Sequence, residues 1–143
     1  MPIKQRNIAK PRFRTIGYRA RYSAFTDGGG AAGTLQFPDT PDTKIPIGAY
    51  VLGTRCVLHT GFTGDTSATI TIGDGSDVDR YNTGTPDVFT AQPVAGIDMG
   101  VPSGTKMHTT AIRPTLTITS GSDWGLVTAG DIEITIGLME FDA

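Results

Sequence analysis

The chain has a single cysteine, Cys56, among 143 residues, so it cannot form an internal disulfide or a zinc site built from several cysteines. It also lacks the run of about 18 or more apolar residues that a membrane span needs, and its first residues lack the apolar core of a secretory signal. No window of a dozen residues has helical apolar spacing free of Gly and Pro. These absences favour a β-rich protein that is made in a cytosol and stabilised by packing or oligomerisation.

The composition is poor in hydrophobic residues, at 38%, and rich in glycine, with 19 glycines. Many short strands joined by tight turns produce this balance. A chain of this length forms one domain and buries roughly 68–70% of the surface that its unfolded form exposes. A single all-β domain is therefore expected.

The longest strand signals lie in the middle and at the end of the chain. Residues Tyr50–Thr60 are rich in β-branched and aromatic types, and Ala68–Ile72 alternates in polarity with period two, so we expect these two segments to pair as an antiparallel hairpin. Asp131–Phe141 carries four aliphatic residues on one face and predicts a long, buried final strand.

Shorter extended segments punctuated by Gly and Pro fill the rest of the chain. They are Thr15–Phe25, Thr34–Phe37, Arg80–Gly84, Asp87–Ala91, Lys106–Ala111 and Thr115–Ser120, with a long connection expected over Val94–Thr105. About eight strands with turn signals between them predict an antiparallel β-sandwich of jelly-roll type rather than a parallel sheet.

The charges are distributed asymmetrically along the chain. The first 21 residues contain seven of the twelve basic residues and no acid, so this segment carries +7 while the remaining 122 residues carry −9. Residues 1–14 have few large apolar side chains and are predicted to form an extended basic arm that precedes a β-sandwich domain over residues 15–143. An arm of this kind orders when it binds a partner.

The residues expected to contact that partner are the basic and larger apolar side chains of the arm. They are Lys4, Arg6, Ile8, Lys10, Arg12, Phe13 and Arg14. Nucleic acid is one possible partner, because Phe13, Tyr18 and Tyr22 are interleaved with the basic residues as stacking platforms would be. A protein partner is favoured, because the acidic body would repel a phosphate backbone whereas an acidic protein surface complements the arm.

The sequence contains no arrangement that points to catalysis. Cys56 and His59 are three residues apart on one strand, so their side chains face opposite sides and cannot form a nucleophile–base pair. The carboxylates of Asp74, Asp77 and Asp79 have the density of a calcium site but miss the EF-hand spacing, so we assign them to a turn. No enzyme activity, metal or other cofactor is expected.

Four stretches together resemble a known group of proteins. They are the run Ile45–Ala49, the long strand expected over Tyr50–Thr60, the segment Thr63–Asp77 with its Ile-Gly-Asp-Gly-Ser-Asp ending, and the strand expected over Asp131–Phe141. They are similar to the small β-sandwich proteins of tailed bacteriophages, which occur as capsid decoration (cement) proteins and in fibre-type appendages. The resemblance covers roughly residues 34–143 and does not include the arm.

This resemblance implies a virion structural protein without catalysis. Decoration of the capsid surface is favoured, with the major capsid protein and other copies of the chain as partners in a dimer or trimer, because the long shaft repeats of a fibre are absent. A phage tail fibre or appendage component remains an alternative. So does a carbohydrate-binding β-sandwich module, which would need a face of exposed aromatic residues.

Overall fold

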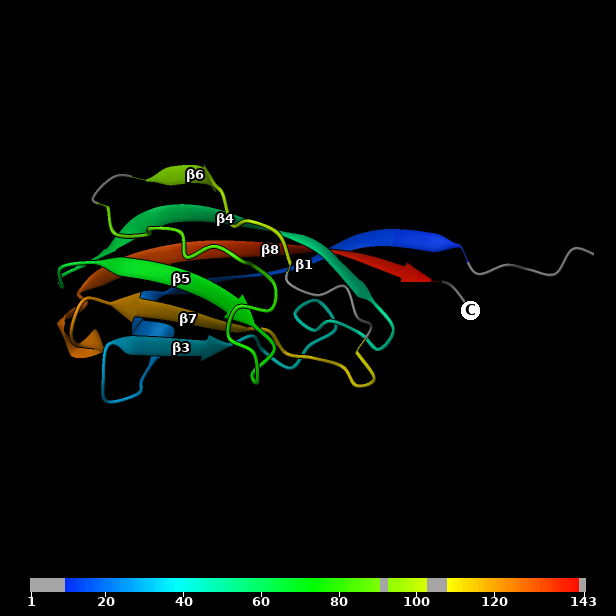
Figure 1. Ribbon diagram of the computed structural model, residues 1–143, viewed down its shortest axis with the longest axis horizontal. Helices are drawn as coiled ribbons and strands as arrows, with labels where there is room; N and C mark the ends of the chain where they lie inside the picture. Colours follow the sequence, from blue (N-terminus) through cyan, green and yellow to red (C-terminus); the bar gives the residue numbers. More distant parts are fainter. Residues whose placement is uncertain (1–9, 91–92, 103–107, 142–143) are drawn as a thin grey trace, which may run out of the picture.

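The computed structural model describes residues 10–90, 93–102 and 108–141. In this part of the chain, eight strands form two four-stranded antiparallel sheets that pack face to face around a hydrophobic core (Figure 1). Sheet A has the order β1-β8-β4-β6, and sheet B has the order β2-β3-β7-β5. The strands are β1 (Pro11–Arg21), β2 (Thr26–Asp27), β3 (Ala32–Gln36), β4 (Tyr50–Thr63), β5 (Ala68–Gly73), β6 (Val94–Ile97), β7 (Thr115–Ser120) and β8 (Ala129–Phe141). The predicted all-β sandwich is confirmed.

The final strand is central, as its alternating pattern predicts. Ile132, Ile134, Ile136 and Leu138 are at most 1% exposed and face sheet B. β8 lies between β1 and β4 and pairs with both along most of its length. Burying one face of such a strand removes four aliphatic side chains from water, each contributing about 1.5–3 kcal/mol relative to an exposed position.

The strand pairs are nested in sequence order, with the loop that follows β5 in the middle. β1 pairs with β8, β3 with β7, and β4 with β6, while Asp87 forms a bridge to Thr69 of β5. The chain is thus one long antiparallel ribbon that winds around the core. Its successive segments alternate between the two sheets.

The expected hairpin between residues 50–60 and 68–72 is wrong. β4 belongs to sheet A and β5 to sheet B, so the loop between them crosses from one layer to the other. Each strand has a face buried in the core, with Leu58 and Ile70 both fully buried. Because the two strands lie in opposite sheets, each buries its apolar face against the other sheet. A hairpin would have placed both strands in the same sheet.

Several weaker assignments also change, among them Arg80–Gly84, which forms turns and bends rather than an extended segment. The stretch expected as a long connection, residues 94–105, contains β6, which pairs with Cys56–Leu58 at the edge of sheet A. Residues 87–91 were expected to form a strand, but only an isolated bridge at Asp87 is present in the described part. Only residues 106 and 107 of the strand expected over Lys106–Ala111 lie outside the described residues. Residues 108–111 are described and form no strand, so that expectation is wrong for them.

One end of the sandwich is closed by aromatic packing. Phe25, Phe62 and Trp124 form a cluster with ring centroids 5.4–6.3 Å apart. Trp124 lies in the short 3-10 turn η2 (Trp124–Leu126) and packs flat on Gly33 of β3, where an added Cβ would lie 2.3 Å from the indole ring. The second 3-10 turn, η1 (Tyr22–Ala24), follows β1 at this same closed end.

Candidate interaction surface

Sheet A extends beyond sheet B at the end opposite the aromatic closure (Figure 1). This projecting end consists of Pro11–Arg14 of β1, Met139–Phe141 of β8 and the start of β4 at Tyr50. The strand β1 therefore begins within the segment, residues 1–14, that was expected to lie outside the β-domain. The boundary differs because strand pairing continues past the core: Pro11–Arg14 pair with Leu138–Phe141 although they are scarcely buried.

Aromatic and aliphatic side chains are exposed on the projecting end. Phe13 pairs with Met139, which pairs with Tyr50, so these three side chains share the outer face of sheet A. Phe13 is 67% exposed and Phe141 is 45% exposed. Phe141 meets Tyr50 edge to face, with ring centroids 6.0 Å apart. These residues form an apolar surface on three neighbouring strands that no other described part of the chain covers.

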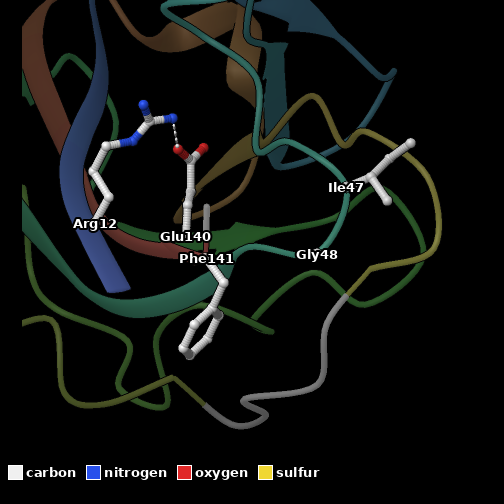
Figure 2. A pocket seen from close by; sticks show the side chains of 5 residues that line it. All are labelled: Arg12, Ile47, Gly48, Glu140 and Phe141. Carbon is white, nitrogen blue, oxygen red and sulfur yellow. Dashed lines mark hydrogen bonds and ion pairs between the residues drawn. The ribbon is translucent and has the colours of Figure 1, made fainter. Parts of the chain in front are cut away.

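Two arginines of β1 share one carboxylate of β8. The Arg12 guanidinium donates to Glu140 Oε2 at 2.9 Å (Figure 2). Arg14 Nε donates to Glu140 Oε1, also at 2.9 Å. Arg14 also donates to the carbonyl of Pro41 at 3.4 Å. Burial raises the pKa of Glu140, but the hydrogen bonds from Arg12 and Arg14 outweigh it and hold the pKa below its ordinary value.

A shallow pocket of about 390 Å³ opens beside this ion pair. Figure 2 shows its lining, which is formed by Arg12, Ile47, Gly48, Glu140 and Phe141. The lining therefore mixes the charged side chains of Arg12 and Glu140 with the apolar side chains of Phe141 and of Ile47, which is 67% exposed. Such a site suits an apolar side chain of a protein partner better than a reacting small molecule.

The residues expected to contact a partner divide into two groups. Arg12, Phe13 and Arg14 lie on the projecting end, and Lys10 is exposed just before it. Lys4, Arg6 and Ile8 lie outside the described residues.

Sequence reasoning missed the surface residues of β8, of the start of β4 and of the loop before β4 that lie near Pro11–Arg14. These are Ile47, Tyr50, Glu140 and Phe141. One signal was present: Phe141 falls out of step with the four aliphatic residues that line the buried face of β8. Their closeness to Arg12 depends on pairing across more than a hundred residues, which no local pattern reports.

The aromatic residues interleaved with the basic ones do not form a row of stacking platforms. Tyr18 packs against Phe37 with ring centroids 5.8 Å apart, and Tyr22 packs partly buried against the core. Phe13 alone of the three is strongly exposed. The geometry therefore gives the nucleic-acid interpretation little support.

The candidate nucleophile is sequestered. Cys56 is fully buried, and burial raises the pKa of its thiol to about 12. His59 lies on the opposite face of β4, as its spacing predicts, with Nε2 3.0 Å from Glu133 Oε1. The other histidine, His108, shares a hydrogen bond of 2.6 Å between its Nε2 and the Tyr81 hydroxyl. Burial is the main reason that the pKa of His108 is lowered.

The acidic loop after β5 is held by hydrogen bonds within the turn. The Asp74 carboxylate accepts from the amides of Ser76 and Asp77 at 2.9 and 2.8 Å, and Asp74 also lies 3.4 Å from the Arg80 guanidinium. These are the contacts of a turn-forming aspartate. Within residues 10–90, 93–102 and 108–141, no three His, Cys, Asp or Glu side chains come together as metal ligands would.

Comparison with known proteins identifies a shared fold. No protein-family model matches the chain, and no curated protein matches it at a significant level. In the part of the chain that the structure describes, no helix has the length and apolar character needed to cross a membrane. Among solved structures, the chain is similar to one described as "Cyanophage Pam1 capsid asymmetric unit", with 13% identity and a TM-score of 0.52. The match covers 98% of this chain and 92% of that chain.

Proposed function

We propose that this protein is a non-enzymatic virion structural protein that decorates a phage capsid and stabilises it by bridging neighbouring shell subunits. The observation that carries the proposal is the projecting end of sheet A, where an apolar surface and a basic strand lie together, outside the core. Monomeric soluble proteins rarely leave contiguous apolar surface of this kind without a partner. On this proposal, the partners are the major capsid protein and other copies of the chain, arranged as a dimer or trimer on the capsid surface.

The fold supports this assignment. Nested strand pairs that alternate between two sheets are the order of a jelly roll, an architecture that viral capsid proteins use. The similar solved chain comes from a phage capsid assembly and aligns over nearly the whole of this protein. A capsid role rather than a tail fibre accords with the lack of shaft repeats in the sequence.

The chemistry of the side chains also favours a structural role. The buried thiol of Cys56 cannot act as a nucleophile at neutral pH, and the His59–Glu133 pair lies on the opposite face of β4 from that thiol. Exposed aromatics do occur on the projecting end, but they adjoin an ion pair and a basic strand rather than forming a separate flat platform for a sugar.

The test is co-sedimentation of the full-length protein with undecorated phage shells at low and high salt. Because β1 begins at Pro11, the deletion that removes the arm without damaging the sheet is residues 1–9. We expect this truncated protein to keep its melting temperature and to bind the shells more weakly. Salt should weaken binding of the intact protein, because part of the contact is between exposed charges.

A pair of matched substitutions tests the apolar part of the surface. Phe13→Ser removes an exposed ring from the projecting end, and Phe89→Ser removes an exposed ring elsewhere. We expect Phe13→Ser to reduce shell binding and Phe89→Ser to leave it unchanged. Full-length protein that fails to sediment with shells at low salt would refute the decoration role.

A further inference from the structure

The strand β1 forms one edge of sheet A, so one of its two sides has no partner strand among the residues that the structure describes. In an antiparallel pair, alternate residues direct their amide and carbonyl groups toward the neighbouring strand and away from it. The Gly17 amide donates to the Asp42 carbonyl at 3.3 Å, away from β8, so odd-numbered residues of β1 face the free edge. Phe13 and Thr15 therefore direct their main-chain groups outward.

The edge is covered in its middle and open toward its start. The loop around Pro41 and Asp42 contacts Arg14 and Gly17, which protects that part of β1. Among the described residues, no backbone hydrogen bond reaches the outward amides of Phe13 and Thr15. Pro11 is also odd-numbered, so its nitrogen faces the free edge. Because that nitrogen carries no hydrogen, Pro11 offers no donor there, and the pairing with β8 loses no hydrogen bond.

The charge of the edge selects which strand can add to it. Residues 10–21 contain five basic residues and no acid, namely Lys10, Arg12, Arg14, Arg19 and Arg21. Two β1 strands from different copies would place like charges opposite each other, which opposes their pairing. The basic arm of another copy is disfavoured for the same reason, whereas an acidic strand is attracted.

The partner strand already present shows what pattern the edge accepts. On its inner side, β1 pairs with Met139-Glu140-Phe141, in which an acid lies opposite Arg12 between two apolar residues. A strand added along the free edge of β1 would lie beside the same side chains. Phe13 is on the outer face of sheet A, and Arg12 and Arg14 are on the opposite face. A strand added there meets the same alternation.

We propose that the free edge of Pro11–Thr15 is a docking site for an extended segment of a partner protein in which acidic and apolar residues alternate. The segment adds to sheet A as a further strand beside β1. Its acidic side chains face Arg12 and Arg14, and its apolar side chains cover Phe13. Main-chain hydrogen bonds supply affinity and the alternation supplies specificity. This inference rests on the proposed function, since it names the chemistry of the shell segment that the projecting end contacts.

The first experiment uses a short synthetic peptide in which glutamate alternates with valine, titrated into the full-length protein and followed by backbone amide NMR. We expect shifts confined to the projecting end and slower hydrogen exchange of the Phe13 and Thr15 amides. The Arg14 amide, which faces β8, serves as the internal reference. A peptide with lysine in place of glutamate should not bind. Shifts that lie elsewhere, or equal binding of the lysine peptide, would overturn the proposal.

Two changes to the main chain separate strand addition from simple charge attraction. Thr15→Pro removes one outward amide while leaving the pairing with β8, and Thr15→Val keeps that amide as the matched control. We expect Thr15→Pro to weaken peptide binding by about tenfold, corresponding to one or two main-chain hydrogen bonds, and Thr15→Val to leave it unchanged. If Thr15→Pro does not fold, a glutamate–valine peptide N-methylated on every residue, which has no main-chain donor on either edge, tests the same bonds with the native protein. Tight binding of that peptide would exclude an added strand.

The outcomes also separate this inference from the proposed function. If full-length protein binds shells and Thr15→Pro binds them equally well, the docking edge is wrong while decoration stands. If the peptide binds at Phe13 and Thr15 but the protein does not bind shells, the edge stands and decoration is wrong. Concentration-dependent dimerisation that Thr15→Pro abolishes would mean that a second copy occupies the edge, which would refute an acidic partner segment.

Discussion

The two ends of the sandwich contain similar aromatic side chains in opposite circumstances. At the closed end, Phe62 and Trp124 are at most 5% exposed because strands of both sheets and the turn η2 surround them. At the projecting end, Phe13 and Phe141 are 67% and 45% exposed because sheet A continues where sheet B has stopped. The comparison shows that the role of an aromatic side chain depends on whether the opposite sheet covers it. Covered rings at the closed end stabilise the fold, and uncovered rings at the projecting end are free to contact a partner.

The largest difference between the two ends is expected when one aromatic ring is removed from each. Trp124→Ala should lower the free energy of unfolding by about 3–5 kcal/mol, because it leaves a cavity between Phe25, Phe62 and Gly33. Phe141→Ala should change it by only about 0.5 kcal/mol, as expected of an exposed position. Urea unfolding followed by circular dichroism measures both. Equal losses for the two variants would contradict the division into a stabilising end and a contact end.

Two glycines, one near each end, test how tightly the main chain is packed there. An added Cβ at Gly33 would lie 2.3 Å from the Trp124 ring, whereas one at Gly53, near the projecting end, meets nothing within 4 Å. Gly33→Ala should therefore cost about 1–3 kcal/mol by overpacking. Gly53→Ala should be neutral or stabilise the protein by up to about 1 kcal/mol, since alanine loses less conformational freedom on folding. Thermal melting of both variants, with the native chain as reference, decides between these outcomes.

The ion pair at the projecting end makes a smaller, pH-dependent contribution. The folded protein holds the pKa of Glu140 below its ordinary value of 4.5, so the stabilisation is present above that pH and is lost as the pH falls through the folded pKa. Glu140→Gln should cost about 1 kcal/mol at pH 7, a modest value because the Arg12 side chain is 61% exposed. Below the folded pKa the two proteins should have equal stability.

The matched control for this prediction is Glu133→Gln on the same strand. Glu133 contacts His59 but is 44% exposed, so its substitution should have less effect at neutral pH. A stability difference between the native protein and Glu140→Gln that persists unchanged at low pH would mean that lost packing, rather than lost charge, explains the effect.

The sequence predicts the faces of the strands well and their partners poorly. Alternation in β8 identified a central strand because each inward side chain must be apolar, whatever strand lies beside it. The same alternation in β5 says nothing about which strand it joins, and its assignment to a hairpin with β4 was wrong. Partner choice depends on how the nested ribbon winds around the core, which involves contacts far apart in the sequence.

The candidate surface shows the same limit. Arg12, Phe13 and Arg14 were singled out as basic and larger apolar side chains of a segment that has few large apolar residues, and all three lie at the projecting end. The same shortage of large apolar side chains also led to the expectation that they lie outside the sheet. The pairing of Arg12 with Glu140, 128 positions away, satisfies the guanidinium group and allows β1 to start earlier. No local feature of residues 1–14 reports that partner.

The smallest effect on stability is expected from Phe13→Ser, and it tests the contact end directly. Phe13 is 67% exposed, so serine removes little buried apolar surface, and the free energy of unfolding should change by less than about 0.5 kcal/mol. The solubility of the isolated protein in ammonium sulfate should nevertheless rise, because the substitution breaks the apolar row that Phe13 forms with Met139 and Tyr50. Phe25→Ser is the counterpart at the closed end and should instead destabilise the fold by several kcal/mol, since it removes about 3 kcal/mol or more of buried aromatic packing. If Phe13→Ser lowers stability as Phe25→Ser does, the ring is part of the core and the projecting end is not a free surface.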